Sequence, residues 1–231
     1  MNTVSCQVFG MIVFMSISTS YLHALNDSPI RLNKEVALKV LIDFTECLNE
    51  AQSTWWLSDG TLLGAIREGD FISYDNDIDI GIMADTFTPR VLQLLVKKGF
   101  TIVFSHGLPE EGLEFTLKRD ETYVDLFLYY PRDKKLYHSC YIHRLKFVRA
   151  QRIDFEYPKF DEFVKYKFLG HLFNVPKDPE KHLEIEYGPG WRIPDPQWRW
   201  EVDTQNKVPT DIIVNPLKDR IVVNKWLSQF M

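Results

Sequence analysis

Hydrophobic residues recur every three to four positions after Asn33, which is the spacing of one face of an α-helix. The apolar positions of this stretch are Val36, Val40, Leu41, Phe44, Leu48 and Ala51. Asn is a favoured N-cap residue because its side chain can accept a hydrogen bond from a backbone N–H of the first turn. The pattern therefore predicts a helix that begins after Asn33 and ends near Gln52.

Short apolar runs rich in β-branched and aromatic residues predict several strands. The first two are "TWWLS" (54–58) and "DIDIGIM" (77–83). Between them, Asp59-Gly60-Thr61 breaks the first strand, and "LLGAIRE" predicts one or two helical turns. Three more strands are predicted at "FTIVFS", "LEFTLK" and "YVDLFLYY", with a turn at residues 119–121 between the last two.

Two further helices are marked by the residues at their ends. Thr88 followed by Pro89 starts one helix, and Gly99 ends it. The other is predicted from Pro179 to Tyr187, with Asp178 as its cap and a glycine after its last residue. Together these elements predict an α+β domain with a mixed β-sheet flanked by helices and an irregular, helical C-terminal part.

The N-terminal residues have the pattern of a targeting segment. Residues 8–17 are nearly all apolar and are followed by small polar residues. A run of about ten apolar residues is short for a bilayer span but fits the apolar region of a signal peptide. No Lys or Arg precedes Arg31, so an uncleaved anchor that attaches the protein to a membrane is the alternative. We expect residues 1–24 to be a signal peptide or short anchor for the secretory pathway (Golgi or ER lumen, or secretion), and residues 25–231 to be the folded domain.

The composition of the chain indicates the size of its hydrophobic core and the kinds of partner that it can bind. The chain of 231 residues is 45% hydrophobic, enough for one domain with a real core. Its net charge of −5 argues against a general attraction to nucleic acid.

Residues 132–167 carry ten Lys/Arg against five acidic residues, which indicates a solvated face of mixed charge or, alternatively, a platform for phosphate-bearing ligands. Cys47 and Cys140 could form one disulfide in an oxidising compartment, but the sequence does not decide whether they meet.

Aspartates gather at the start of a predicted strand in "SYDNDIDIGI". Alternate residues of a strand share a face, so Asp77 and Asp79 project together while Ile78 and Ile80 point into the core. Asp125 lies inside "YVDLFLYY", although Asp is disfavoured in the middle of a strand. Three carboxylates make an oxygen cage suited to a hard cation such as Mg²⁺ or Mn²⁺. The predicted metal ligands are therefore Asp77, Asp79 and Asp125.

Two other interpretations explain the acidic run less well. A polar edge whose aspartates cap turns suits Asp75 alone. A calcium loop of the EF-hand type needs Gly and Glu at positions where this chain has Ile80 and Thr86. A bound metal explains the run better, since its positive charge lets neighbouring carboxylates coexist.

A possible phosphate-binding turn precedes the acidic run. Gly60 and Thr61 lie where the strand at 54–58 gives way to a helix. Backbone N–H groups and a hydroxyl at such a turn favour phosphate binding. A strand, a Gly-Ser/Thr pair, a helix and then a strand with Asp-x-Asp resembles the core of the nucleotidyltransferase fold.

Over roughly residues 55–194 the chain resembles the LicD/fukutin family. "LSDGTLLGAIREGDFISYDNDIDIGI" contains the Gly-Thr-Leu-Leu-Gly motif (Gly60 to Gly64), Arg67, and an aromatic residue followed by Asp-x-Asp-x-Asp. "VDLFLYY" resembles the downstream strand of the family with its Asp, and "NVPKDPEKHLEIEYGPGW" resembles its C-terminal signature. The chain differs from the family pattern at two places: Asn76 stands where Asp is frequent, and Ser73-Tyr74 replaces a common Pro-Trp. Neither difference involves the proposed metal ligands.

The resemblance implies transfer of a phosphorylated alcohol, either phosphocholine or ribitol 5-phosphate, from a CDP-activated donor to a glycan hydroxyl, with release of CMP. Asp77, Asp79 and Asp125 would be catalytic, with Asp125 as the base or as a second-metal ligand. The residues implied to bind substrate are Gly60, Thr61, Gly64, Arg67 and Asp75. For Arg67, a loop-ordering salt bridge to Asp75 is an equal alternative to phosphate contact.

Other functions remain open at this point. One is a catalytically inactive, secreted homologue that binds a glycan or acts as a partner subunit, and another is transfer of the nucleotide itself. Trp191, Trp198 and Trp200 fit a sugar platform or, more simply, core packing. His138 and His143 are predicted on opposite faces of a strand-like segment, which is poor geometry for a shared metal ion.

Overall fold

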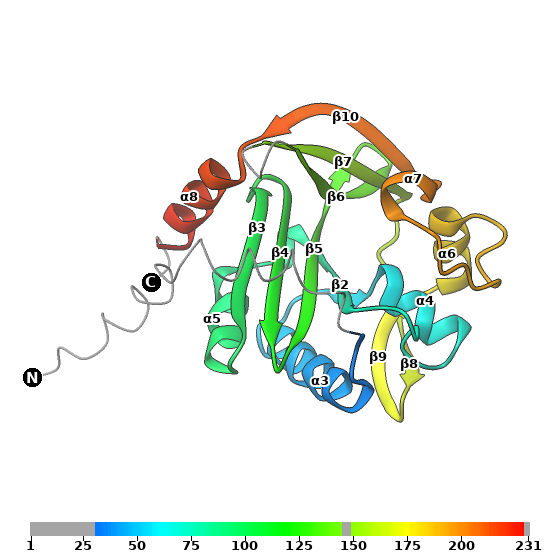
Figure 1. The fold of residues 1–231 in the computed structure, drawn as a ribbon. Coiled ribbons are helices and arrows are strands. Elements are labelled where there is room, and N and C mark those ends of the chain that lie inside the picture. Colours follow the sequence, from blue (N-terminus) through cyan, green and yellow to red (C-terminus); the bar gives the residue numbers. More distant parts are fainter. Residues whose placement is uncertain (1–30, 145–148, 229–231) are drawn as a thin grey trace, which may run out of the picture.

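The computed structural model describes residues 31–144 and 149–228 and confirms the α+β fold (Figure 1). The segment expected to be a signal peptide or anchor lies outside these residues. The helices are α3 (Lys34–Glu50), α4 (Asp59–Arg67), the 3-10 turn η1 (Ala84–Thr86), α5 (Pro89–Lys97), α6 (Pro179–Tyr187), α7 (Trp200–Asp203) and α8 (Pro216–Leu227). The strands are β1 (Trp55–Leu57), β2 (Asp77–Met83), β3 (Thr101–Leu108), β4 (Glu111–Arg119), β5 (Thr122–Arg132), β6 (Lys135–Arg144), β7 (Arg149–Pro158), β8 (Phe163–Phe168), β9 (His171–Pro176) and β10 (Lys207–Val214).

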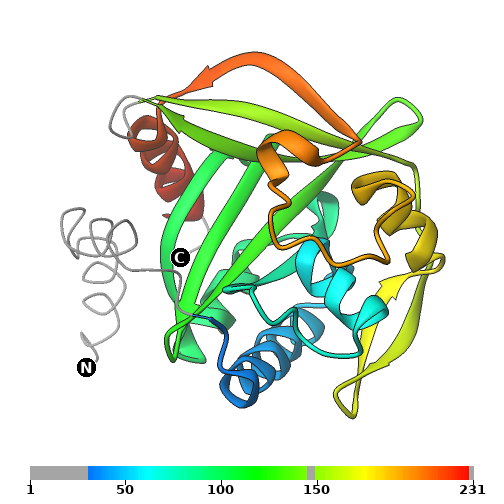
Figure 2. The same ribbon diagram turned by 45° about the vertical axis from the view of Figure 1, so that its right-hand side comes forward.

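One mixed sheet organises the domain. Its strand order is β1-β2-β5-β6-β7-β10, with β4 paired to β5 and β3 paired to β4. β2 and β5 run parallel, and their register sets Asp79 beside Asp125. β5 pairs with β6 through residues 130–132, so the part formed by β6, β7 and β10 lies across the end of the other strands, as Figure 2 shows. β8 and β9 form a separate hairpin.

Alternation along β2 and β5 decides which face of the sheet forms the core. Ile78, Ile80 and Ile82 of β2 are fully buried, and so are the apolar residues beside them on β5. They belong to one hydrophobic cluster with the buried face of α3, including Leu41 and Phe44. The aspartates of the two strands therefore face the opposite side, where α4 packs against β2 and α6 packs against α4.

Local signals set the helix ends as predicted. Asn33 accepts a hydrogen bond from the backbone N–H of Val36 (3.2 Å) at the start of α3. Asp178 accepts one from the N–H of Lys181 (3.1 Å) at the start of α6. Gly188 ends α6 with a φ of 79°, in the left-handed region that favours glycine. The bounds predicted for β2 and α6 agree with the structure.

The C-terminal part contains more strands than the irregular, helical region expected from the sequence. The β8–β9 hairpin and the edge strand β10 accompany the helices there. The pairing of β10 with β7 is irregular between Pro209 and Ile213, and both Ile212 and Ile213 remain exposed. A strand without alternate burial carries no period-two pattern, which is why the sequence did not reveal it.

The basic stretch at 132–167 forms ion pairs within the sheet. Arg132 contacts Asp154 (2.7 Å) and Glu156 (3.1 Å), and the buried Arg152 contacts Asp154 (2.7 Å) as well. These guanidinium groups therefore stabilise the β6–β7 region, which weakens the alternative of a phosphate platform.

Cys47 and Cys140 are both free thiols, so the disulfide considered from the sequence is not formed. Within residues 31–144 and 149–228, no helix is long and apolar enough to cross a membrane.

Candidate functional site

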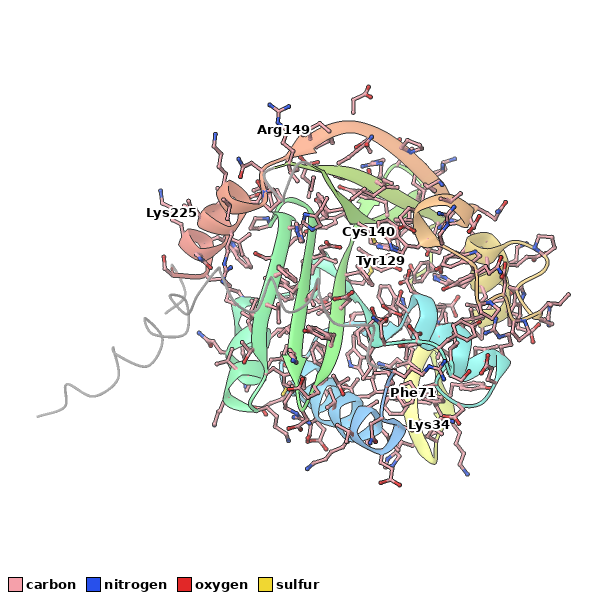
Figure 3. All side chains as sticks on the ribbon, in the orientation of Figure 1. Lys34, Phe71, Tyr129, Cys140, Arg149 and Lys225 are labelled. Atoms are coloured by element: carbon pink, nitrogen blue, oxygen red, sulfur yellow. The ribbon has the colours of Figure 1, made fainter. Side chains whose placement is uncertain are left out.

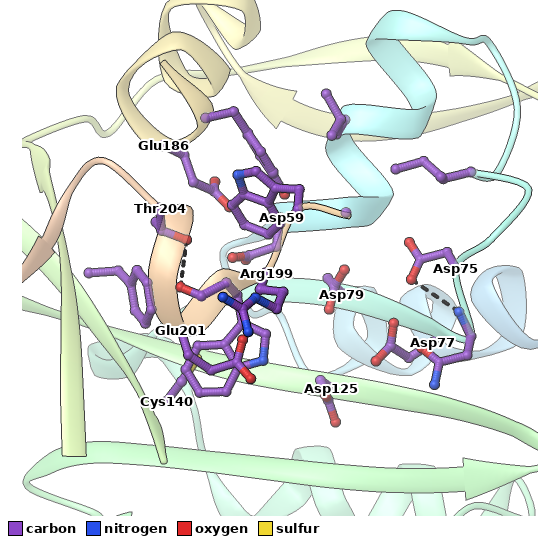
Figure 4. Close-up of a pocket in the computed structure, with 18 of the residues that line it drawn as sticks. Asp59, Asp75, Asp77, Asp79, Asp125, Cys140, Glu186, Arg199, Glu201 and Thr204 are labelled. Atoms are coloured by element: carbon purple, nitrogen blue, oxygen red, sulfur yellow. Dashed lines mark hydrogen bonds between the residues drawn. The ribbon is translucent and has the colours of Figure 1, made fainter. Parts of the chain in front are cut away.

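The carboxylate face of β2 and β5 borders a cavity of about 850 Å³ (Figure 4). The start of α4, the end of α6, the segment at 187–204 and residues of β3, β4 and β6 provide the other walls. Six of the carboxylates that line the cavity come from α4, β2 and the turn before it, β5 and α6: Asp59, Asp75, Asp77, Asp79, Asp125 and Glu186. Sequence reasoning had found four of these six, and the fold brings those four into one place.

Asp75, Asp77 and Asp79 form a carboxylate cluster in which one oxygen of each lies within 4.8 Å of the others. Asp77 and Asp79 share a face of β2, and Asp75 comes from the turn before it, where its N–H donates to the carbonyl oxygen of Ile72 (3.0 Å). Burial, followed by repulsion from Asp77, raises the pKa of Asp75 to about 8. Burial also raises the pKa of Asp77 and, more strongly, that of Asp79. A divalent cation would offset this repulsion.

Gly60 and Thr61 support the carboxylate cluster from the start of α4. The N–H of Thr61 donates to Oδ2 of Asp79 (3.3 Å), and the N–H of Asp79 donates to Oγ1 of Thr61 (2.8 Å). A Cβ at Gly60 would lie 2.7 Å from Oδ2 of Asp75 and 3.0 Å from Oδ2 of Asp79. The lack of a side chain at Gly60 therefore lets α4 approach the cluster. Phosphate binding by this Gly-Thr pair stays a prediction.

Asp125 lies on β5 directly beside Asp79 and lines the same cavity. Its Oδ1 atom is buried and has no hydrogen-bond partner, which is costly for a carboxylate. Burial, followed by the charge of Asp77, raises the pKa of Asp125 well above its usual range. Of the three predicted metal ligands, two belong to the carboxylate cluster, and Asp125 adjoins it from the next strand.

Arg67 and Gly64 connect α4 to neighbouring segments. Nη1 of Arg67 donates to the carbonyl oxygen of Trp191 (3.2 Å), and its ion pair is with Glu68 (2.7 Å) instead of Asp75. Arg67 lines the cavity, so its contact with a donor phosphate stays a prediction. A Cβ at Gly64 would lie 2.7 Å from a backbone oxygen of the following loop. Gly64 is therefore explained by close packing, and it is not part of the cavity wall.

Sequence reasoning missed Asp59 and Glu186 of this group, and it did not single out Glu114, Asp195 and Glu201, which also line the cavity. Glu186 is 2% exposed and accepts a hydrogen bond from the Tyr157 hydroxyl (3.0 Å); its burial raises its pKa well above the usual range. Asp59 opens α4 and accepts a hydrogen bond from Oγ of Ser58 (2.6 Å). Asp59 sits directly before the Gly-Thr pair and Glu186 within "EIEYGPGW", but in the sequence they resemble a turn residue and a helix-surface residue.

Three tryptophans complete the wall opposite the strands. Trp191 is 5% exposed and belongs to the core, as the simpler prediction held. Trp198 and Trp200 are half-buried at the cavity, and the ring of Trp198 lies 4.6 Å from that of Tyr187. These two rings are available to a ligand in the cavity.

Known proteins resemble most of this chain. The human protein named ribitol-5-phosphate transferase FKTN is 26% identical over 170 residues, which is 71% of this chain and 35% of that protein. Human ribitol 5-phosphate transferase FKRP is 28% identical over 209 residues, 85% of this chain and 39% of that protein. An uncharacterized protein of Caenorhabditis elegans is 31% identical over 184 residues, 75% of this chain and 47% of that protein. The chain thus spans about a third to a half of the length of these relatives.

A family model covers the part of the chain that builds the carboxylate face. Residues 52–178 match the model described as LicD/FKTN/FKRP, nucleotidyltransferase domain. This range contains β1, α4, β2 and β5, and with them the carboxylate cluster and Asp125. The resemblance inferred from the motifs is confirmed: the chain belongs to the LicD/FKTN/FKRP nucleotidyltransferase-domain family.

Proposed function

We propose that this protein is a transferase that moves ribitol 5-phosphate, or a related phosphorylated alcohol such as phosphocholine, from a CDP-activated donor to a glycan hydroxyl. The observation that carries the proposal is the convergence of the carboxylate cluster and Asp125 on one cavity in a domain of this family. Two human relatives are named as ribitol 5-phosphate transferases, which favours ribitol over choline.

Mg²⁺ or Mn²⁺ is the cofactor that we propose. The donor set suits such an ion, because the cluster offers three carboxylate oxygens within 4.8 Å and the buried Oδ1 of Asp125 beside it lacks a partner. Asp77 and Asp79 would hold the ion, with Asp75 and Asp125 as the further carboxylates in reach. When bound, it would neutralise the diphosphate of the donor and the charge on the transferred phosphoryl group.

The residues of the chain would bind the donor and accept the proton. Gly60 leaves space beside the cluster, and Arg67 at the cavity wall would contact a donor phosphate. Asp125 was predicted as either base or metal ligand, and its place beside Asp79 supports the role of ligand. The proton of the acceptor hydroxyl would then pass to another carboxylate of the cavity.

We further propose that the protein acts in the lumen of the secretory pathway. The support is the apolar run at residues 8–17, together with the resemblance to the LicD/fukutin family. The same family resemblance supports a glycan or glycoprotein as the acceptor.

The test is to incubate the purified protein with CDP-ribitol, CDP-choline or CDP-glycerol, each with Mg²⁺, Mn²⁺ or EDTA, and to measure CMP. We expect metal-dependent CMP release, fastest with CDP-ribitol, and none with EDTA. Intact CDP-alcohols in every combination, together with binding to immobilised glycans, would establish the inactive homologue instead.

A further inference from the structure

A buried histidine lies behind the cavity with its polar atoms unpaired. His138, in the middle of β6, is 0% exposed, and neither ring nitrogen has a hydrogen-bond partner. Aromatic rings surround it, with centroids 4.7 Å (Tyr129), 4.9 Å (Phe127) and 5.1 Å (Phe155) away. An unpaired buried polar group costs about 1–3 kcal/mol, so a phenylalanine would suit this environment better if packing were the only requirement.

The carboxylate of Asp59 lies near this histidine. Nε2 of His138 lies 3.8 Å from Oδ1 of Asp59, which is slightly beyond a hydrogen bond. The other oxygen, Oδ2, accepts from the Ser58 hydroxyl at 2.6 Å, and that hydroxyl lies 2.9 Å from the hydroxyl of Tyr129. The Ser58 hydroxyl, itself in contact with Tyr129, therefore holds the Asp59 carboxylate on the side away from the cavity. A ligand in the cavity does not displace these groups.

The backbone at Asp59 has an uncommon conformation, which it shares with turn residues such as Asp120 and Asp133. Its φ is 43°, in the left-handed region that residues other than glycine rarely adopt. Such conformations cost of order 1–3 kcal/mol and are concentrated at functional sites. This one turns the side chain of Asp59 into the cavity, beside the carboxylate cluster, with 20% of its surface exposed.

We propose that Asp59 is the catalytic residue that takes the proton of the acceptor hydroxyl, and that His138 is a positioning residue that holds it. This inference rests on the proposed function. The hydroxyl oxygen bonds to the phosphorus that carries the alcohol, the bond from that phosphorus to the bridging oxygen breaks, and CMP leaves with the electron pair. The hydroxyl proton passes to the Asp59 carboxylate and is later released to water. A neutral His138, with its proton on Nε2, faces Oδ1 of Asp59 at 3.8 Å, and in the proposal this contact shortens to a hydrogen bond that orients the carboxylate when the substrates bind.

Of the six carboxylates contributed by α4, β2, β5 and α6, the other five are less suited to this role. Those of the carboxylate cluster lie together where they would hold the proposed cation, and Asp125 stands beside them. Glu186 is 2% exposed and already accepts a hydrogen bond from Tyr157. Asp59 combines access from the cavity with support from behind, which a general base requires.

The experiment measures CMP release from CDP-ribitol with Mg²⁺ and with water as the acceptor, for the wild type and four variants. Asp59→Asn should lower kcat about 100-fold, with the donor KM and the Mg²⁺-induced shift in Tm unchanged. His138→Phe should lower kcat about tenfold with the donor KM unchanged, and its Tm should equal or exceed that of the wild type. His138→Gln, which keeps an N–H donor, should recover much of kcat even if its Tm is lower.

His182→Phe is the matched control. His182 is also buried, stacks on Tyr157 at 4.3 Å and has an unpaired Nε2, but it does not line the cavity. Its replacement should leave kcat unchanged. If Asp59→Asn or His138→Phe turns over like the wild type, or if kcat falls only in step with Tm, the inference is overturned while the proposed function stands. A wild type that is inert with every CDP-alcohol overturns both.

Discussion

The carboxylate cluster offers a direct test of metal binding, through the substitution Asp77→Asn. Asparagine has the shape of aspartate and can still accept a hydrogen bond, but it carries no charge. Without metal, the substitution removes like-charge repulsion between side chains whose oxygens lie within 4.8 Å of one another. With metal, it removes one of the groups that would bind the ion. The variant should therefore be more stable than the wild type in EDTA and should gain less stability from Mg²⁺.

The expected size of both effects follows from the geometry. Two unit charges 4.8 Å apart repel by about 3.5 kcal/mol at an effective dielectric constant of about 20. The pKa of Asp75 is raised to about 8, so the cluster keeps a proton near neutral pH and part of this repulsion is already relieved. We expect Asp77→Asn to raise the free energy of unfolding without metal by about 1–2 kcal/mol. A metal at about 100 times its Kd should stabilise the wild type by about 2.7 kcal/mol.

Urea unfolding in EDTA, Mg²⁺ and Mn²⁺ measures these differences, with CMP release from CDP-ribitol as a second readout. For a domain of this size, 2.7 kcal/mol corresponds to about 5–10 °C in Tm, so thermal melts give an independent check. Turnover of Asp77→Asn should fall about 100-fold. Asp120→Asn is the matched control, because Asp120 is 57% exposed in the turn between β4 and β5. Its metal shift should equal that of the wild type. Equal metal shifts in Asp77→Asn and the wild type would refute the assignment of Asp77 as a ligand.

Three other substitutions test separate parts of the structure. Gly60→Ala should keep the fold but reduce the Mn²⁺-induced rise in Tm, because the new Cβ would lie 2.7 Å from Oδ2 of Asp75; a full rise would contradict the close approach of α4. Burial lowers the pKa of His182 to about 3, so the unfolded chain gains a proton that the folded chain does not as pH falls below about 6.5, and stability falls. His182→Phe should remove about 2 kcal/mol of the loss between about pH 7 and pH 5 in urea unfolding, and an unchanged pH dependence would contradict the shift. Arg152→Met should cost about 1.5–3 kcal/mol in the same assay because it removes one buried partner of Asp154 while Arg132 remains, and a cost below about 1 kcal/mol would mean that this pair is not stabilising.

The fold could be predicted from the sequence where short-range rules decide the structure. Helix α6 begins at a proline after Asp178 and ends before Gly188, so its bounds follow from capping and backbone preference alone. β2 alternates between isoleucine and aspartate over its first residues and ends near Met83, again as predicted. β10 could not be predicted, because its place depends on β7, a partner about fifty residues earlier in the chain, and its own residues are exposed without alternation.

The same distinction explains which site residues the sequence revealed. Asp77 and Asp79 share a face because strands alternate, a rule that needs no tertiary information. The approach of Asp125 to Asp79 also needs the parallel register of β2 and β5, and there the family motif supplied what periodicity could not. Asp75 was predicted to bind substrate outside the strand pair, whereas its carboxylate lies within the cluster. The turn that closes between Ile72 and Asp75 accounts for this placement.

Asp59 and His138 lie beyond the reach of such rules because their proximity is created by packing. Asp59 opens α4, and its left-handed backbone has no signal in the sequence other than Asp before Gly. His138 comes from β6, nearly eighty residues later in the chain. It lies near Asp59 because β5 runs from the carboxylate cluster to the part of the sheet that β6, β7 and β10 form. An apolar residue at position 138 would pack against the surrounding rings without burying unpaired nitrogen atoms. Packing alone therefore does not account for this histidine. Unpaired buried polar groups reduce stability, so a structural role and a functional role of His138 predict different outcomes, and the opposite effects expected of His138→Phe on Tm and kcat separate the two explanations.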